Sequence, residues 1–184
     1  LGAQIRLPAS RSRVSHCPAA PLPLDGGDYR HRRAITSMSQ IAIGSDHAGY
    51  ALKALLADDL RAAGHDIIDC GTANDTDSVD YPDFGAAVAT AIADGRAQFG
   101  IVVCGSGIGI SIAANRNPAV RAALCTSGLM AKLAREHNDA NCLALGSRII
   151  GVEVARDCVA QFLSTPFAGG RHAARVTELS EVPR

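Results

Sequence analysis

The stretch from Cys104 to Ser111 contains the residues best suited to chemistry in this sequence of 184 residues. A cysteine follows the apolar run 99–103 and opens the glycine-rich sequence Cys-Gly-Ser-Gly-Ile-Gly-Ile-Ser. Glycines allow the backbone to turn tightly and to direct N–H groups at a ligand, and the amino end of a following helix adds partial positive charge. Such surroundings favour a thiolate, so Cys104 is a candidate base.

Two other interpretations of this stretch are a dinucleotide site and an inert core cysteine. Ile110 stands where the GxGxxG fingerprint requires glycine, and no Walker A pattern occurs in the chain, so a nucleotide site is disfavoured. A free cysteine is often only a small buried hydrophobe. That interpretation suits most of the others, which lack zinc-ligand spacing: Cys17, Cys70, Cys125, Cys142 and Cys158.

Further polar residues stand where predicted strands or helices end. Asp46 and His47 follow the apolar run 41–45, and a carboxylate beside an imidazole suits sugar hydroxyls or phosphate, although an aspartate there is also an ordinary helix cap. His137 ends a predicted helix, where it is either a partner of the helix dipole or a proton donor. Arg171 and Arg175 are four residues apart and suit phosphate, or simply a solvated helix face.

The elements that must position these residues alternate regularly along the chain. We expect strands over residues 41–45, 66–70, 99–104, 120–125 and 141–145, and helices over 48–63, 83–94, 108–115, 129–137, 152–163 and from 171. This alternation predicts an α/β fold, a single-domain doubly wound (Rossmann-like) five-stranded parallel sheet with a C-terminal helix. Ligands of such sheets bind beyond the carboxyl ends of the strands, where the polar residues gather.

The first 39 residues differ from the rest of the chain. They are rich in proline, glycine and arginine without periodicity, which predicts a disordered N-terminal extension over 1–39 before a domain over 40–184. We favour an upstream or artefactual extension over an organelle transit peptide, because Met38 stands where a natural start would fall. A net charge of zero and apolar runs of only strand length argue against nucleic-acid or membrane partners.

The order of these motifs resembles the type B ribose-5-phosphate isomerases, a family that also contains galactose-6-phosphate isomerase subunits. The resemblance covers about Gln40 to the C-terminus and leaves the front extension unmatched. The matching blocks are Gly-Ser-Asp-His-Ala-Gly (44–49), Asp-Tyr-Pro (80–82), Cys-Gly-Ser-Gly-Ile-Gly-Ile-Ser (104–111), Glu-His-Asn-Asp-Ala-Asn (136–141), Gly-Ser-Arg (146–148) and Gly-Gly-Arg-His (169–172) with Arg175.

The resemblance implies an aldose–ketose isomerase of the pentose phosphate pathway that interconverts D-ribose 5-phosphate and D-ribulose 5-phosphate. Cys104 would move the proton between C1 and C2 through an enediolate, and His137 would open the furanose ring. Ser106 and the backbone of Gly105, Gly107, Ile108 and Gly109 would hold the oxyanion. The sugar would be contacted by Asp46, His47, Tyr81 and Asn138. The phosphate would be bound by Arg148, Arg171, Arg175 and His47.

The same resemblance implies no cofactor and no metal, and a homodimer or dimer of dimers with active sites at the subunit interface. The cysteines, most of them inside apolar runs and none in a CxxC pair, predict a reduced, cytoplasmic setting. Some relatives use a glutamate base near position 111 instead, but Ser111 offers no carboxylate. Two alternatives remain. One is an isomerase of a six-carbon sugar phosphate, such as allose 6-phosphate or galactose 6-phosphate, and the other is a non-catalytic sugar-phosphate-binding module.

Overall fold

The computed structural model describes residues 38–180, which contain a five-stranded parallel sheet. The strands are β1 (Gln40–Ser45), β2 (Asp66–Asp69), β3 (Phe99–Cys104), β4 (Ala122–Leu124) and β5 (Cys142–Gly146). Their order in the sheet is β2-β1-β3-β5-β4. The predicted α/β class and parallel sheet are confirmed. Because the chain leaves β1 toward β2 on one side and later returns to β3 on the other, a crevice is expected beyond the ends of β1 and β3.

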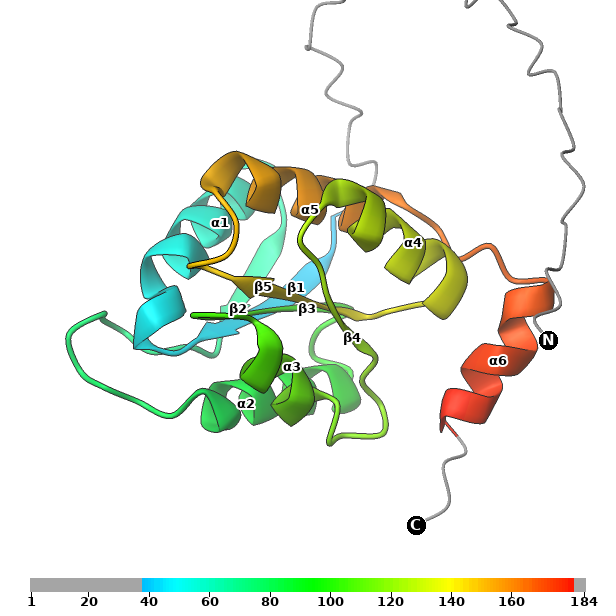
Figure 1. Cartoon of the computed structure of the whole chain (residues 1–184), viewed down its shortest axis with the longest axis horizontal. Helices are drawn as coiled ribbons and strands as arrows, with labels where there is room; N and C mark the ends of the chain where they lie inside the picture. The colour runs from blue at the N-terminus through cyan, green and yellow to red at the C-terminus, as the bar shows by residue number, and fades with distance from the viewer. Residues whose placement is uncertain (1–37, 181–184) are drawn as a thin grey trace, which may run out of the picture. The chain divides into compact units, whose positions relative to one another are not determined.

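Helices cover both faces of the sheet, as a doubly wound fold requires (Figure 1). On one face lie α1 (Tyr50–Ala62), α4 (Gly128–Asn138) and α5 (Val152–Ser164), and on the other lie α2 (Tyr81–Ala93) and α3 (Ile108–Ala114). A 3₁₀ turn over His47–Gly49 precedes α1. The final helix, α6 (Arg171–Ser180), lies beside α4 and buries none of its residues.

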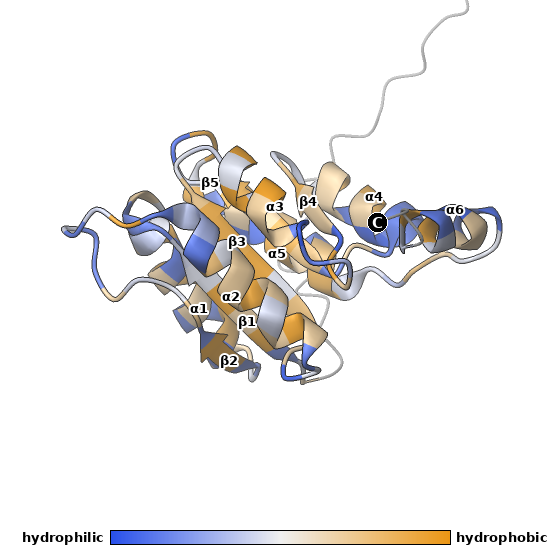
Figure 2. Ribbon diagram, turned by 90° about the horizontal axis from the view of Figure 1, so that it is seen from below, coloured by the Kyte–Doolittle hydropathy of each residue, from blue (hydrophilic) through white to orange (hydrophobic). Residues whose placement is uncertain are grey.

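The core is divided between the two faces by the two-residue period of the strands. In β3, Ile101 and Val103 point to the face covered by α1, α4 and α5, whereas Val102 and Cys104 point to the face covered by α2 and α3. Figure 2 shows this concentration of hydrophobic residues on the central strands and a mainly hydrophilic α6. Burial on both faces explains why the central strands are continuously apolar in sequence.

The strand predicted over 120–125 is shorter in the structure, where β4 covers only Ala122–Leu124. Its late start has a reason: the Val120 N–H donates to the Asn117 carbonyl at 3.0 Å and the Arg121 N–H donates to Asn141 Oδ1 at 2.8 Å, so neither bonds to the backbone of β5. At the outer edge of β4, the side chain of Asn115 pairs with Ala122. Its Oδ1 accepts from the Ala122 N–H at 2.8 Å and its Nδ2 donates to the Ala122 carbonyl at 2.9 Å. This amide therefore takes the place of a neighbouring strand at the edge of the sheet.

The predicted disordered segment lies outside the described residues except for Met38 and Ser39. Ser39 is buried, its N–H donates to His65 Nδ1 at 3.3 Å, and its carbonyl accepts from the Asp66 N–H at 3.1 Å. Ordered structure therefore begins no later than Ser39. Between residues 38 and 180, no helix combines the length and the apolar character needed to cross a membrane.

Candidate active site

Several of the predicted site residues leave the sheet side by side at its carboxyl edge. In the strand register Ser45 pairs with Val103, and Cys104 pairs with Gly146. The residues that follow these strand ends, including Asp46 and Arg148, therefore surround Cys104. This edge is also the crevice expected from the strand order.

Cys104 is 4 % exposed and ends β3 at the beginning of the glycine loop. Its Sγ accepts a hydrogen bond from the Gly107 N–H at 3.1 Å. Gly107 has a φ of 76°, and a Cβ there would stand 2.5 Å from Leu124 Cδ1, so only glycine fits. The loop thereby aims an amide at the sulfur, where such a donor can stabilise negative charge.

The other cysteines of residues 38–180 are in different surroundings. Burial raises the pKa of Cys142 to about 12. Burial, with Cys158 as a second cause, raises the pKa of Cys125 to about 12. The pKa of Cys158 is raised to about 11 mainly by burial, and that of Cys70 is also raised by burial. These thiols stay protonated at neutral pH and are poor candidates for a base.

Asp46 and His47 hold fixed orientations beside this loop. The Asp46 Oδ1 accepts from the Gly49 N–H at 2.9 Å, so this carboxylate does cap the 3₁₀ turn, and its side chain is buried. The His47 Nδ1 accepts from the Val79 N–H at 3.2 Å. A ring nitrogen that accepts carries no proton, so the neutral ring must hold its proton on Nε2.

Tyr81 and Arg148 complete this first group of residues. The Tyr81 ring lies so close to the backbone of Gly109 that a Cβ there would stand 2.5 Å from Tyr81 Cζ. The Arg148 side chain lies over Gly105, where an added Cβ would stand 3.4 Å from Arg148 Nη1, and the Arg148 N–H donates to the Gly105 carbonyl at 3.0 Å. The structure thus brings together Asp46, His47, Tyr81, the loop 104–109 and Arg148.

Ser106 and Ile108 interact with each other inside the loop. The Ile108 N–H donates to Ser106 Oγ at 3.2 Å, and the Gly107 N–H is directed at Cys104. The loop amides predicted to hold an oxyanion therefore include two that are engaged within the loop itself. The hydroxyl hydrogen of Ser106 remains a donor that can turn toward a ligand.

The remaining predicted site residues form a second group, around the end of α4 and the start of α6. The His137 ring stacks on His172, with centroids 4.3 Å apart and planes 7° apart. Desolvation, followed by the nearby His137, Arg171 and Arg175, lowers the pKa of His172 below its ordinary value. His172 belongs to the Gly-Gly-Arg-His motif (169–172) but is not among the predicted site residues. This concentration of cationic groups suits an anion such as phosphate.

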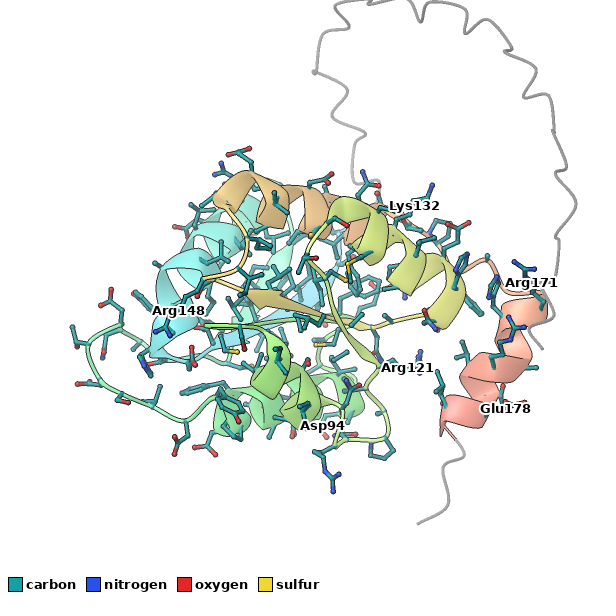
Figure 3. All side chains as sticks on the ribbon, in the orientation of Figure 1. Asp94, Arg121, Lys132, Arg148, Arg171 and Glu178 are labelled. Carbon is teal, nitrogen blue, oxygen red and sulfur yellow. The ribbon has the colours of Figure 1, made fainter. Side chains whose placement is uncertain are left out.

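The two groups lie at the opposite edges of the sheet that are formed by the ends of the strands. The first group is at the carboxyl end of β3, and the second is beside its amino end. The carbonyl of Asn141, just after α4, accepts from the Gly100 N–H at 2.8 Å, so α4 ends beside the start of β3. Cys104 lies four residues further along β3, which is about 13 Å at the rise of a strand. Figure 3 shows Arg148 and Arg171 at opposite ends of the fold. Within one chain, His137 and Cys104 are therefore not brought together.

An ionic network that was not predicted fixes the end of α4. Asp139 has a φ of 45°, a left-handed conformation that is uncommon outside glycine. Its carboxylate accepts from Arg135 at 2.8 Å and from Arg121 at 2.9 Å, and the Arg121 Nε also donates to the Asn138 carbonyl at 3.2 Å. These contacts hold the turn that carries His137 and Asn138. Arg135 and Asp139 have the i,i+4 spacing of a local pair, but no local sequence pattern indicates the contact with Arg121, which is 18 residues from Asp139.

Within residues 38–180, no group of three or more histidine, cysteine, aspartate or glutamate side chains could hold a metal ion. The expectation that the chain needs neither metal nor cofactor stays a prediction.

Comparisons with known proteins match this fold and these motifs. The family model described as Ribose/Galactose Isomerase matches residues 41–179. Ribose-5-phosphate isomerase B of Escherichia coli (strain K12) is 42 % identical over 145 residues, which cover 79 % of this chain and 97 % of the relative. The solved structure of Clostridium thermocellum ribose-5-phosphate isomerase B is 54 % identical, with a TM-score of 0.76, and the match covers 78 % of this chain and 96 % of that one. Trypanosoma brucei type B ribose 5-phosphate isomerase is 41 % identical, also with a TM-score of 0.76, over 80 % of this chain and 100 % of that one.

Proposed function

The chain belongs to the ribose/galactose isomerase family, and from this premise we propose that it interconverts D-ribose 5-phosphate and D-ribulose 5-phosphate through an enediolate. The observation that carries the proposal is the placement of Cys104 at the carboxyl end of β3, with the Gly107 amide on its sulfur. Relatives of 42 % and 54 % identity that carry the name ribose-5-phosphate isomerase B support the choice of substrate.

Cys104 is proposed as a proton shuttle rather than a covalent nucleophile. Its thiolate takes the proton from C2 of the open-chain aldose, the C–H electrons form the C1–C2 double bond, and negative charge develops on O1. A proton passes from O2 to O1, and the thiol returns its proton to C1, which leaves a ketone at C2. Ser106 and loop amides not engaged within the loop stabilise the developing charge.

Opening of the furanose ring is assigned to His137, which transfers a proton to the ring oxygen. Because His137 and Cys104 of one chain lie at opposite edges of the sheet, we assign these two roles in each site to different copies of the chain. One copy supplies Asp46, His47, Tyr81, the loop 104–109 and Arg148. The other supplies His137, Asn138, Arg171 and Arg175, with the arginines on the phosphate.

Two surfaces support a homodimer of this kind. Ile108 and Ile112, one turn apart on α3, are 55 % and 60 % exposed and place apolar surface beside the loop 104–109. A groove of about 840 Å³ lies near the second group, lined by residues that include Arg121, Asn138 and Leu179. If α3 of one copy enters the groove of the other, its loop 104–109 approaches His137 of that copy. A dimer of dimers is compatible with the same contact.

We further propose that the enzyme works in the cytoplasm. A cysteine base has to remain a free thiol, and thiols stay reduced in that compartment. The cysteines of the described residues are all free, in agreement with such an environment.

The test is a coupled assay of Cys104→Ala with ribose 5-phosphate, compared with wild type. We expect kcat to fall by a factor of about 100 or more, the usual contribution of a general base, while calorimetry still detects binding. Cys158→Ala is the matched control, since Cys158 lies on α5 against the opposite face of the sheet, and it should keep wild-type turnover. Near-normal turnover by Cys104→Ala would contradict the assignment. Assays with allose 6-phosphate and galactose 6-phosphate distinguish a six-carbon substrate from the pentose.

A further inference from the structure

A buried lysine near the proposed site has no role in the chemistry described above. Lys53 lies on α1 with only 2 % of its surface exposed. Its Nζ donates to both carboxylate oxygens of Asp69 at 2.8 Å and to the carbonyl of Thr72 at 3.0 Å. An ammonium group has three hydrogens, and all three are used here. Lys53 therefore has no donor left for a substrate phosphate.

The contacts of Lys53 hold the segment 69–72 against the end of β1. The Gly71 N–H donates to Asp69 Oδ1 at 2.9 Å, and the Thr72 N–H donates to the carbonyl of Ser45 at 3.1 Å. A Cβ on Gly71 would stand 2.7 Å from the Ser45 nitrogen and 2.9 Å from Lys53 Cδ. The segment thus packs closely against Ser45, the residue that precedes Asp46.

The other end of the same loop is attached to His47. The Val79 N–H donates to His47 Nδ1, two residues before Tyr81. The loop between β2 and α2 is therefore fastened at its start by Lys53 and at its end by His47. A change at Lys53 reaches Asp46 through Ser45 and reaches His47 and Tyr81 through the loop.

We propose that Lys53 is a positioning residue, whose buried ammonium holds Asp46 and His47 in the orientation that the isomerisation needs without touching the substrate. This inference rests on the proposed function. Burying a lysine carries a large desolvation cost, which explains why its paired carboxylate and a carbonyl are placed so close to it. The Asp69 side chain, at the carboxyl end of β2, is 41 % exposed, so the carboxylate keeps contact with water while the ammonium does not.

The experiment measures kcat and KM for ribose 5-phosphate in Lys53→Met, which keeps the length of the side chain and removes the charge. We expect kcat/KM to fall roughly tenfold to a hundredfold, since a small misplacement of site residues has effects of this size. Lys53→Arg should recover part of the loss. Asp69→Asn should show the same defect, and this variant decides the matter if Lys53→Met does not fold.

Coupling to His47 separates positioning from a purely structural role. In the Lys53→Met background, His47→Ala should cost much less than in wild type, because His47 has already lost its position. If Lys53 has only a structural role, Lys53→Met lowers the melting temperature but leaves kcat and KM unchanged, and His47→Ala reduces activity by the same factor in both backgrounds. That outcome would overturn the inference. Arg156→Met is the matched control. This substitution breaks an exposed ion pair between Arg156 Nε on α5 and Asp59 Oδ2 on α1, which are 2.8 Å apart. It should leave kcat and KM unchanged. Failure of the wild-type protein to isomerise ribose 5-phosphate would refute the proposed function. Normal kinetics in Lys53→Met beside an active wild type would refute only the inference about Lys53.

Discussion

At the scale of single residues, His47 illustrates how one backbone contact defines a side chain's chemistry. Its Nδ1 accepts from the Val79 N–H, so the neutral ring carries its proton on Nε2. Protonation of Nδ1 would set two hydrogens against each other and break the attachment of the loop. His47 is therefore better suited to donate a neutral hydrogen bond than to hold phosphate as a cation.

This tautomer predicts different outcomes for two amide substitutions of His47. His47→Gln places an amide nitrogen near the position of Nε2 and, although the Val79 N–H loses its acceptor, should keep KM for ribose 5-phosphate closer to wild type than His47→Asn does. His47→Asn reaches only the position of Nδ1 and should raise KM about tenfold, the worth of one hydrogen bond. Steady-state kinetics test this, and nitrogen NMR of the imidazole reads the tautomer directly. Equal damage in both variants, or a neutral ring with its proton on Nδ1, would contradict it.

The sequence permitted prediction of contiguous site residues but not of the residues that hold them. Strand, glycine turn and helix follow one another along the chain and predict Cys104 as a candidate base, whereas the role of Ser106 is implied by the family resemblance. Lys53 and Asp69 are 16 residues apart, and their ion pair depends on how α1 packs against β2. Such contacts have no local signature, since they follow from the tertiary fold.

At the scale of secondary structure elements, the end of α4 shows how a helix terminus can be locked. Asp139 occupies a left-handed conformation where glycine or asparagine is usual. Its carboxylate joins Arg121 and Arg135, and these ion pairs offset the backbone strain. The helix therefore presents His137 and Asn138 from a rigid end.

Replacement of Asp139 separates its backbone role from its ionic role. Asp139→Gly keeps the left-handed turn and removes both ion pairs, so kcat should fall about tenfold as His137 loses its fixed position. Asp139→Ala adds a backbone penalty of roughly 1–2 kcal/mol and should unfold more easily than the glycine variant. Kinetics and thermal unfolding measure the two effects. Wild-type kcat in Asp139→Gly would show that the network serves stability alone.

The elements themselves were well predicted, because apolar runs and helical periodicity are local properties. The order of the strands was not predicted. β5 lies between β3 and β4, and its residues are fully buried, whereas those of β4 are only half-buried. The more apolar strand takes the interior position, which places Arg148 beside Cys104.

At the scale of the whole molecule, the two groups of site residues divide the proposed chemistry between two edges of the sheet. A mixture of two inactive variants tests this division. Cys104→Ala and His137→Ala should each be inactive, but a mixed dimer contains one site with both residues intact. After exchange of subunits, an equal mixture should recover about a quarter of wild-type activity. No recovery, despite mass-spectrometric proof of mixed dimers, would mean that both residues act within one chain.

The exposed helix α6 carries Arg171 and Arg175 but buries none of its residues. If α6 completes the site of another copy, as proposed, a newly made chain has no catalytic activity until it forms a dimer. At low concentration the rate then rises with the square of the amount of chain rather than in proportion to it. A compound that occupies α6 or its groove would act as an inhibitor by keeping the copies apart, without resembling a sugar at all.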